Sequence, residues 1–202
     1  MARRRLQRPW PQLAAIGLLA VLASPPLRGL LEASMSLHML LQFPLLVLAG
    51  HVLAGGLQPS VAEKLQRWNA HGLTGLLAAA LLLSLLMIPR LLDLALVDLR
   101  FEVAKWLALL ATGAALRLSW NRAGLLGQFF FLGNMLPMTA MAGSLFIDSP
   151  LRVCNAYLLD DQIRVGQGLI VACVVVATAW LVMATRVLAR QAEPQMPASA
   201  AE

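Results

Sequence analysis

The sequence predicts an all-α integral membrane protein, a single bundle of about six transmembrane helices with both termini in the cytoplasm. Hydrophobic residues make up 59% of the chain and charged residues only 13%, and the mean hydropathy is +0.74. A soluble domain needs charged residues over its surface, whereas a bilayer favours apolar side chains there as well. The charges fall in short clusters between long apolar runs, as in loops that separate spans. The net charge of +6 belongs to these clusters and gives no support for nucleic-acid binding.

Six apolar segments account for this bundle. A span needs ~20 apolar residues to cross the ~30 Å hydrocarbon layer, and five segments meet that requirement. They cover about residues 34–57, 69–88, 101–118, 124–146 and 165–188. Residues 1–190 then form one transmembrane domain, and 191–202, rich in Ala, Pro and Ser, form a disordered cytoplasmic tail. The stretches 58–68 and 147–164 are expected to be loops.

The first segment, about residues 10–31, has two interpretations. Four arginines precede residue 9, and the apolar run 13–23 has the length of a signal-peptide core. However, Pro25 and Pro26 follow at once and the apolar character resumes at Leu27, which favours a retained helix. In either case the next helix begins on the outer side of the membrane.

The distribution of basic residues predicts the orientation. Cytoplasmic stretches of a membrane protein carry an excess of Lys and Arg. With six spans, ten basic residues fall on the side of the termini and five on the opposite side, where most of the acidic residues lie. Lys105 falls within a span, near its outer end, from which its ammonium group is expected to extend outward.

A soft-metal site is predicted near the outer end of the second span. Met35, His38, Met39 and Gln42 are spaced by three or four residues and therefore share one helical face. Pro44 follows and removes one backbone donor, which frees the carbonyl group of Leu40.

The fifth span offers a matching surface. Met135, Met138 and Met141 recur every three residues beside Asn134, and Pro137 lies at a depth similar to that of Pro44. Two kinked helices would bring thioether and imidazole groups together, and such groups suit copper(I). The alternative is that the methionines fill the core and that His38 is only hydrogen-bonded.

The other two histidines suggest a different cofactor. His51 lies near the inner end of the second span and His71 near the inner start of the third. Facing helices that each supply an imidazole can hold a haem, so a small bis-histidine haem b cytochrome is an alternative. Solvated histidines without a metal are the other interpretation.

Charged groups near the outer ends of the spans have local explanations. Glu102 and Lys105 are three residues apart, as expected for an ion pair on one helix. Asp160 and Asp161 precede the sixth span, where they would cap its first amide groups or form an acidic lip that attracts a cation. No nucleotide-binding loop, zinc-protease helix or nucleophile elbow is present, so no enzymatic activity is predicted.

Three motifs resemble one family. The run SLHMLLQFPLL at residues 36–46 is similar to the H-M-x-x-Q/H helix of the CtaG family, and so are IPRLLD at 88–93 and Asp161-Gln162 followed by Gly166 and Gly168. Members of this family are multi-pass membrane proteins linked to assembly of caa3-type cytochrome c oxidase. In this sequence Gln42 and Phe43 occupy the turn where a second histidine is expected.

The resemblance implies a non-enzymatic assembly factor in the bacterial inner membrane. Such a factor would help to mature the copper centre of a respiratory oxidase and would contact oxidase subunits and membrane lipid. Carried over to this chain, the family motifs fall on His38 and Met39 in the helix and on Asp161 and Gln162 later. The copper hypothesis assigns His38, Met35, Met39, Met138 and Met141 as ligands, with Gln42, Asn134, Asp160 and Asp161 around them. A cytochrome and a transporter or scaffold subunit are the alternative functions.

Overall fold

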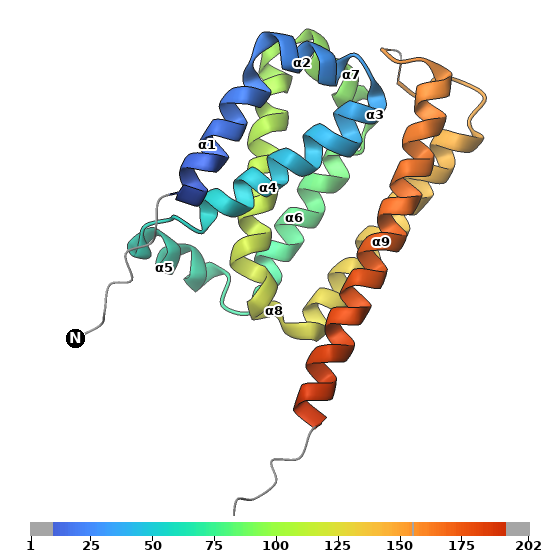
Figure 1. Cartoon of the computed structure of the whole chain (residues 1–202). Coiled ribbons are helices and arrows are strands. Elements are labelled where there is room, and N and C mark those ends of the chain that lie inside the picture. Colours follow the sequence, from blue (N-terminus) through green and yellow to red (C-terminus); the bar gives the residue numbers. More distant parts are fainter. Residues whose placement is uncertain (1–9, 155, 193–202) are drawn as a thin grey trace, which may run out of the picture.

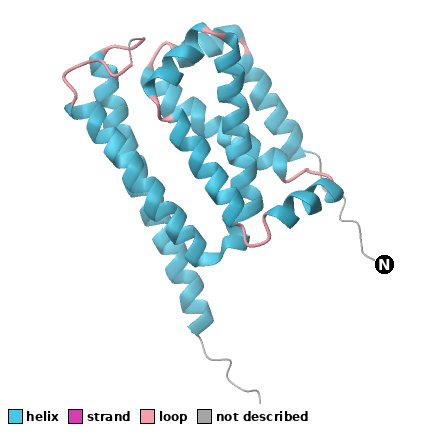
Figure 2. Cartoon of the chain, turned by 180° about the vertical axis from the view of Figure 1, so that it is seen from behind, coloured by secondary structure: helices cyan, strands magenta, loops and turns pink. Residues whose placement is uncertain are grey.

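The structure, a computed structural model, describes residues 10–154 and 156–192, and every regular element in these residues is a helix (Figures 1 and 2). The predicted tail at 193–202 and the arginines before residue 9 lie outside the described residues. Helix α1, Trp10–Ala23, is followed at once by α2, Pro25–Glu32, and the two meet at 72°. The bend arises where Pro25 begins a new helix, because proline has no N–H group to continue the hydrogen bonding of the preceding one.

The predicted kink in the second span takes the form of a π-helical turn. Helix α3, Met35–Leu37, continues through the π-helix η1, His38–Gln42, into α4, Phe43–Ala54. The Phe43 N–H group bonds to the His38 carbonyl group, five residues back. Pro44 stands just after this turn and cannot donate, so the backbone rearranges at the proline rather than leaving a regular α-helix with one missing bond.

Two segments expected between spans are helices. Residues 58–68 were predicted as a loop, but Pro59–Trp68 forms α5, which meets α6, Leu73–Leu86, at 86°. Pro89–Val97 forms α7. Both short helices begin at a proline, whose fixed φ angle suits the first helical position.

The chain reverses direction within one element. Helix α8, Leu99–Asp148, keeps helical hydrogen bonding on both sides of Gly124, whose φ of 61° and ψ of −176° are accessible essentially only to glycine. Figure 1 shows α8 turning back at this point, so that its second half runs beside α9, Leu159–Ala192. Helix α9 begins before the predicted 165, which shortens the expected loop at 147–164.

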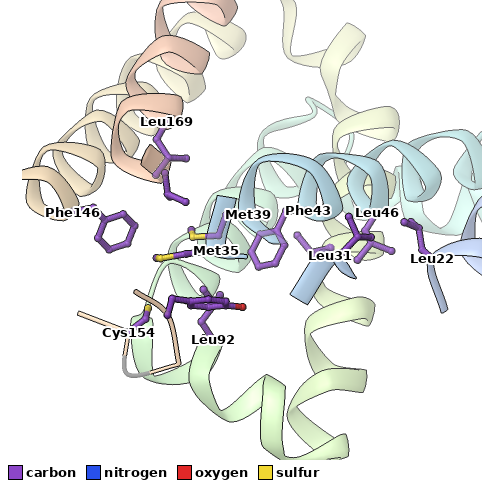
Figure 3. Packing of buried hydrophobic residues seen from close by; sticks show 13 residues of the cluster. Leu22, Leu31, Met35, Met39, Phe43, Leu46, Leu92, Phe146, Cys154 and Leu169 are labelled. Carbon is purple, nitrogen blue, oxygen red and sulfur yellow. The ribbon is translucent and has the colours of Figure 1, made fainter. Parts of the chain in front are cut away.

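Small residues allow the helices to approach closely. A Cβ atom on Gly50 would overlap the backbone of Leu110, and one on Gly113 would overlap the Val47 carbonyl oxygen, so α4 and the first half of α8 pack backbone to backbone. Gly143 and Gly166 make the equivalent contact between the second half of α8 and α9. Close approach of helices at small residues is the usual mode of helix packing in membranes. A buried apolar cluster lies where α3 and α4 meet both halves of α8 and α9, and it includes Met35 and Met39 (Figure 3).

Helices long and apolar enough to cross a membrane are present in the described chain. Three qualify on their own: Met35–Ala54, Leu99–Asp148 and Leu159–Gln191. The number rises to five if each of the bent pairs α1–α2 and α5–α6 is one span. The all-helical fold is therefore confirmed and its long apolar helices support a membrane protein, whereas the six-span arrangement and the position of the termini stay predictions.

Candidate functional site

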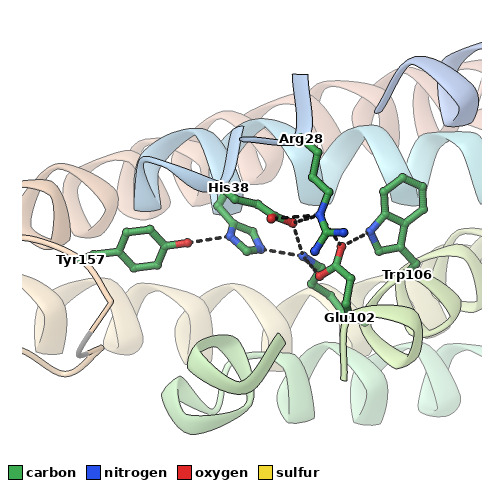
Figure 4. A network of polar contacts seen from close by, with 7 residues as sticks. Arg28, His38, Glu102, Trp106 and Tyr157 are labelled. Atoms are coloured by element: carbon green, nitrogen blue, oxygen red, sulfur yellow. Dashed lines mark hydrogen bonds and ion pairs between the residues drawn. The ribbon is translucent and has the colours of Figure 1, made fainter. Parts of the chain in front are cut away.

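His38 is the centre of a buried polar network at one end of the bundle (Figure 4). Its Nδ1 atom lies 2.7 Å from the Tyr157 hydroxyl group and its Nε2 atom 3.0 Å from Lys105 Nζ. A lysine ammonium group only donates hydrogen bonds, so Nε2 must accept. The ring is then a neutral imidazole that carries its proton on Nδ1 and donates it to the oxygen of Tyr157. Both ring nitrogens of His38 are therefore already occupied.

Four charged side chains from α2 and α8 extend this network. Lys105 Nζ lies 2.8 Å from Glu102 Oε2 and 3.4 Å from Glu32 Oε1. Arg28 Nε lies 3.0 Å from Glu32 Oε2 and 3.7 Å from Glu102 Oε1. Trp106 Nε1 donates to Glu102 Oε1 at 2.6 Å. The predicted Glu102–Lys105 pair is thus present, within a larger group of two positive and two negative charges.

The prediction that Lys105 extends outward is wrong. The residue is only 3% exposed, and its ammonium group points to His38 and the two glutamates. The physical reason is the bend between α1 and α2, which brings Arg28 and Glu32 to the part of α8 that carries Lys105. A buried charge is tolerated where partners of opposite charge and hydrogen bonds compensate its lost hydration.

Asp161 caps a helix other than its own. Its carboxylate accepts hydrogen bonds from the hydroxyl groups of Ser34, at 3.1 Å, and Ser36, at 2.6 Å, and from the backbone N–H groups of Met35 and Ser36. The two backbone N–H groups belong to the first turn of α3, where no helical carbonyl group can accept from them. Asp161 therefore lies in the first turn of α9 as predicted, but its hydrogen bonds cap α3 instead of α9, and Asp160 beside it is exposed. Asp161 instead joins α9 to the helix that carries His38.

Gln162 fixes the loop that supplies Tyr157. Its Oε1 atom accepts from the Val153 N–H group at 2.8 Å, and its Nε2 atom donates to the carbonyl groups of Phe146 at 3.0 Å and Leu151 at 3.4 Å. Within the same loop, burial raises the pKa of Tyr157 above its ordinary value, with nearby Glu32 adding to the effect. Burial, with a smaller effect of Asp93, raises the pKa of Cys154 to about 12. Both side chains are therefore neutral at physiological pH.

The five predicted copper ligands lie in different environments. Met35 and Met39 are buried in the apolar cluster, and His38 is buried with both nitrogens hydrogen-bonded. Met138 lies against α6, where its sulfur accepts from the Ser84 hydroxyl group at 3.6 Å, and Met141 is 74% exposed. Met141 therefore lies outside the core that encloses His38. In the described residues no group of three or more His, Cys, Asp or Glu side chains is placed to hold a metal ion.

The remaining predicted residues divide between the core and the surface. Gln42 is fully buried, and neither of its amide atoms has a hydrogen-bond partner within the described chain. Asn134 is exposed and donates to the Phe130 carbonyl group on its own helix. For the haem alternative, His51 Nε2 lies 3.4 Å from Arg117 Nη1, and His71 is exposed in the turn before α6.

Sequence reasoning missed most of the network around His38. Arg28 and Glu32 are four residues apart, a spacing typical of helical ion pairs. However, they lie at the end of the first segment, which could be read as a signal peptide or as a retained helix. Tyr157 is the only tyrosine in the sequence and lies in a predicted loop with no periodic signal. Comparison with known proteins gave no match to a family model, to a curated protein or to a solved structure.

Proposed function

We propose that the chain is a non-enzymatic membrane assembly factor that assists maturation of a respiratory oxidase. Its partner-binding surface lies at the end of the bundle that contains His38. The observation that carries this proposal is that the three motifs resembling the CtaG family converge there. The Asp161 carboxylate binds the serines just before His38, and Gln162 holds the loop that contributes Tyr157. In the same loop, the Ala156 N–H group approaches Asp93 Oδ1, at the end of the 88–93 motif, to 3.4 Å.

The geometry argues for a specific form of this function. A metal ion on His38 would have to displace either Tyr157 or Lys105, and the ammonium group 3.0 Å from Nε2 repels a cation. We therefore propose that His38 shapes and orders this end for a protein partner, and that copper ligation by His38 is secondary to that role. The partner would be an oxidase subunit awaiting its copper centre.

The test compares two adjacent aspartates in a deletion strain. Loss of the gene should lower the copper content and activity of the oxidase. Wild type and Asp160→Ala should restore both, because Asp160 is exposed, whereas Asp161→Ala should not, because four donors around residues 34–36 lose their acceptor. Immunoblots of membranes must show equal amounts of the two variants. Normal oxidase in the deletion strain would refute the proposed function.

A second candidate function is favoured by the chain of hydrogen bonds itself. Tyr157, His38, Lys105 and Glu102 form an unbroken series of buried polar groups at one end of the apolar bundle, and ionisable groups in such places commonly carry protons or ions. Proteoliposomes with an internal pH dye separate the two functions. A proton flux that is lost in His38→Gln would favour a transporter, and its absence from wild-type vesicles would favour the assembly factor.

A further inference from the structure

Helix α5 has the features of an interfacial helix and lies at the end of the bundle opposite to α3, the helix that leads into His38 (Figure 1). It contains no buried residue and meets α6 at 86°, so it lies across the bundle end rather than along it. Val61, Leu65 and Trp68 recur on one face at spacings of four and three and are exposed by 42%, 45% and 85%. An amphipathic helix with exposed apolar residues and a terminal tryptophan is typical of the boundary between lipid headgroups and acyl chains.

A polar cavity lies between α5, the end of α4 and α8. Its volume is about 370 Å³, and its lining includes Gly55, Gln66, Arg117, Asn121 and Arg122. The two arginines are five residues apart on α8, shortly before the Gly124 reversal, and both are exposed. Gln66 comes from the polar side of α5, so the interfacial helix forms one wall of the cavity.

Among the described residues, no carboxylate pairs with the arginines of this cavity. All side-chain ion pairs found in the described residues involve Arg28 or Lys105 at the opposite end of the bundle. Arg117 contacts His51, which brings no negative charge, and its guanidinium group lies beside Gly55. On α5, Lys64 and Arg67 outnumber the one acidic residue, Glu63, so this helix adds a net positive charge at this end. Guanidinium groups free of carboxylates are suited to bidentate binding of phosphate.

We propose that this cavity binds the phosphate headgroup of an anionic phospholipid. Arg117 and Arg122 hold the phosphate, and Gln66 and Asn121 supply amide hydrogen bonds from the two walls. The acyl chains extend along the apolar face that ends at Trp68. This exposed apolar face belongs to the helix that forms one wall of the cavity, and it favours a membrane lipid over a soluble phosphate compound. The proposal is independent of the function of the His38 end.

The test is native mass spectrometry of the full chain released from detergent, with phosphatidylglycerol and phosphatidylcholine as the lipid probes. Wild type should retain phosphatidylglycerol in preference to phosphatidylcholine. Arg117→Gln/Arg122→Gln should weaken phosphatidylglycerol binding by roughly a hundredfold, since a hydrogen bond to a charged group contributes about tenfold or more for each arginine. The matched control is Arg186→Gln/Arg190→Gln, which removes the same charge from α9 outside the cavity and should change binding only severalfold.

A second variant keeps the test valid if the double arginine variant does not fold. Asn121→Asp places a carboxylate in the cavity with almost no change in volume, and it should weaken phosphatidylglycerol binding by about tenfold. Equal losses in the cavity variants and the α9 control would show unspecific attraction and overturn the proposal. Full competition by millimolar inorganic phosphate would overturn it too, since the ligand would then be a free anion. Equal retention of both lipids by wild type would have the same consequence.

Discussion

Replacing Gln42 by methionine should stabilise the protein. The side chain is fully buried, and both its Nε2 and Oε1 atoms lack hydrogen-bond partners within the described chain. Each unsatisfied buried polar atom costs about 1–3 kcal/mol. Methionine has a similar shape and no such atoms, so Gln42→Met should raise the free energy of unfolding by at least about 1 kcal/mol.

Gln162 provides the matched control, because it is as deeply buried but fully bonded. Its amide makes three hydrogen bonds, to the Val153 N–H group and to the carbonyl groups of Phe146 and Leu151. At about 0.5–1.5 kcal/mol each, their loss in Gln162→Met should lower the free energy of unfolding by about 1.5–4.5 kcal/mol. The same chemical change is therefore expected to have opposite signs at two positions.

The assay is unfolding of the purified chain in mixed micelles, by titration of a non-denaturing detergent with dodecyl sulfate. Both variants are compared with wild type by the shift of the unfolding midpoint. A Gln42→Met variant that is less stable than wild type would refute the reasoning, because it would show that the amide is satisfied in the membrane-embedded protein. A variant that is more stable but fails to support oxidase assembly would instead assign the amide to function.

Three other predictions use the same unfolding assay or a labelling reaction. Gly113→Ala should lower the free energy of unfolding by more than about 2 kcal/mol, because its Cβ atom would overlap the backbone of α4, whereas Gly133→Ala, which meets open space, should be nearly neutral. Lys105→Met should destabilise by about 3–5 kcal/mol, since the buried Glu102 loses its cationic partner at 2.8 Å and keeps only Arg28 at 3.7 Å, and Lys64→Met on the exposed α5 should not. Alkylation of Cys154 at pH 8 should be much slower in the folded protein than in the unfolded chain, because burial shields the thiol and keeps it neutral, and equal rates would contradict its raised pKa.

Hydropathy predicted the long apolar helices, because an apolar run can be recognised from its own residues without knowledge of tertiary contacts. The same patterns did not reveal α5, since its apolar residues are few and their period becomes visible only once the helix is assumed. Gly124 was read as the start of a span, and the reversal there agrees with the boundary predicted between the fourth and fifth segments.

The candidate site was predictable only in part. His38 and Asp161 were singled out by residue type, but their partners depend on tertiary arrangement. The position of Glu32 beside Lys105 follows from the bend at Pro25, and the contact of Asp161 with Ser36 joins residues 125 positions apart. A periodicity argument treats each helix alone, so it assigned Lys105 to the nearest surface and Asp161 to its own helix.

The charges around Lys105 have a consequence for the electrical behaviour of the protein. Two cationic and two anionic side chains lie within one network, so their sum is zero while all four are ionised. Displacing a net charge across a membrane potential changes its energy by about 2.3 kcal/mol per 100 mV. Movement of the intact network as a unit therefore does no electrical work. Protonation of Glu32 alone would leave a net charge of plus one, and only then would the membrane potential act on the network as a whole.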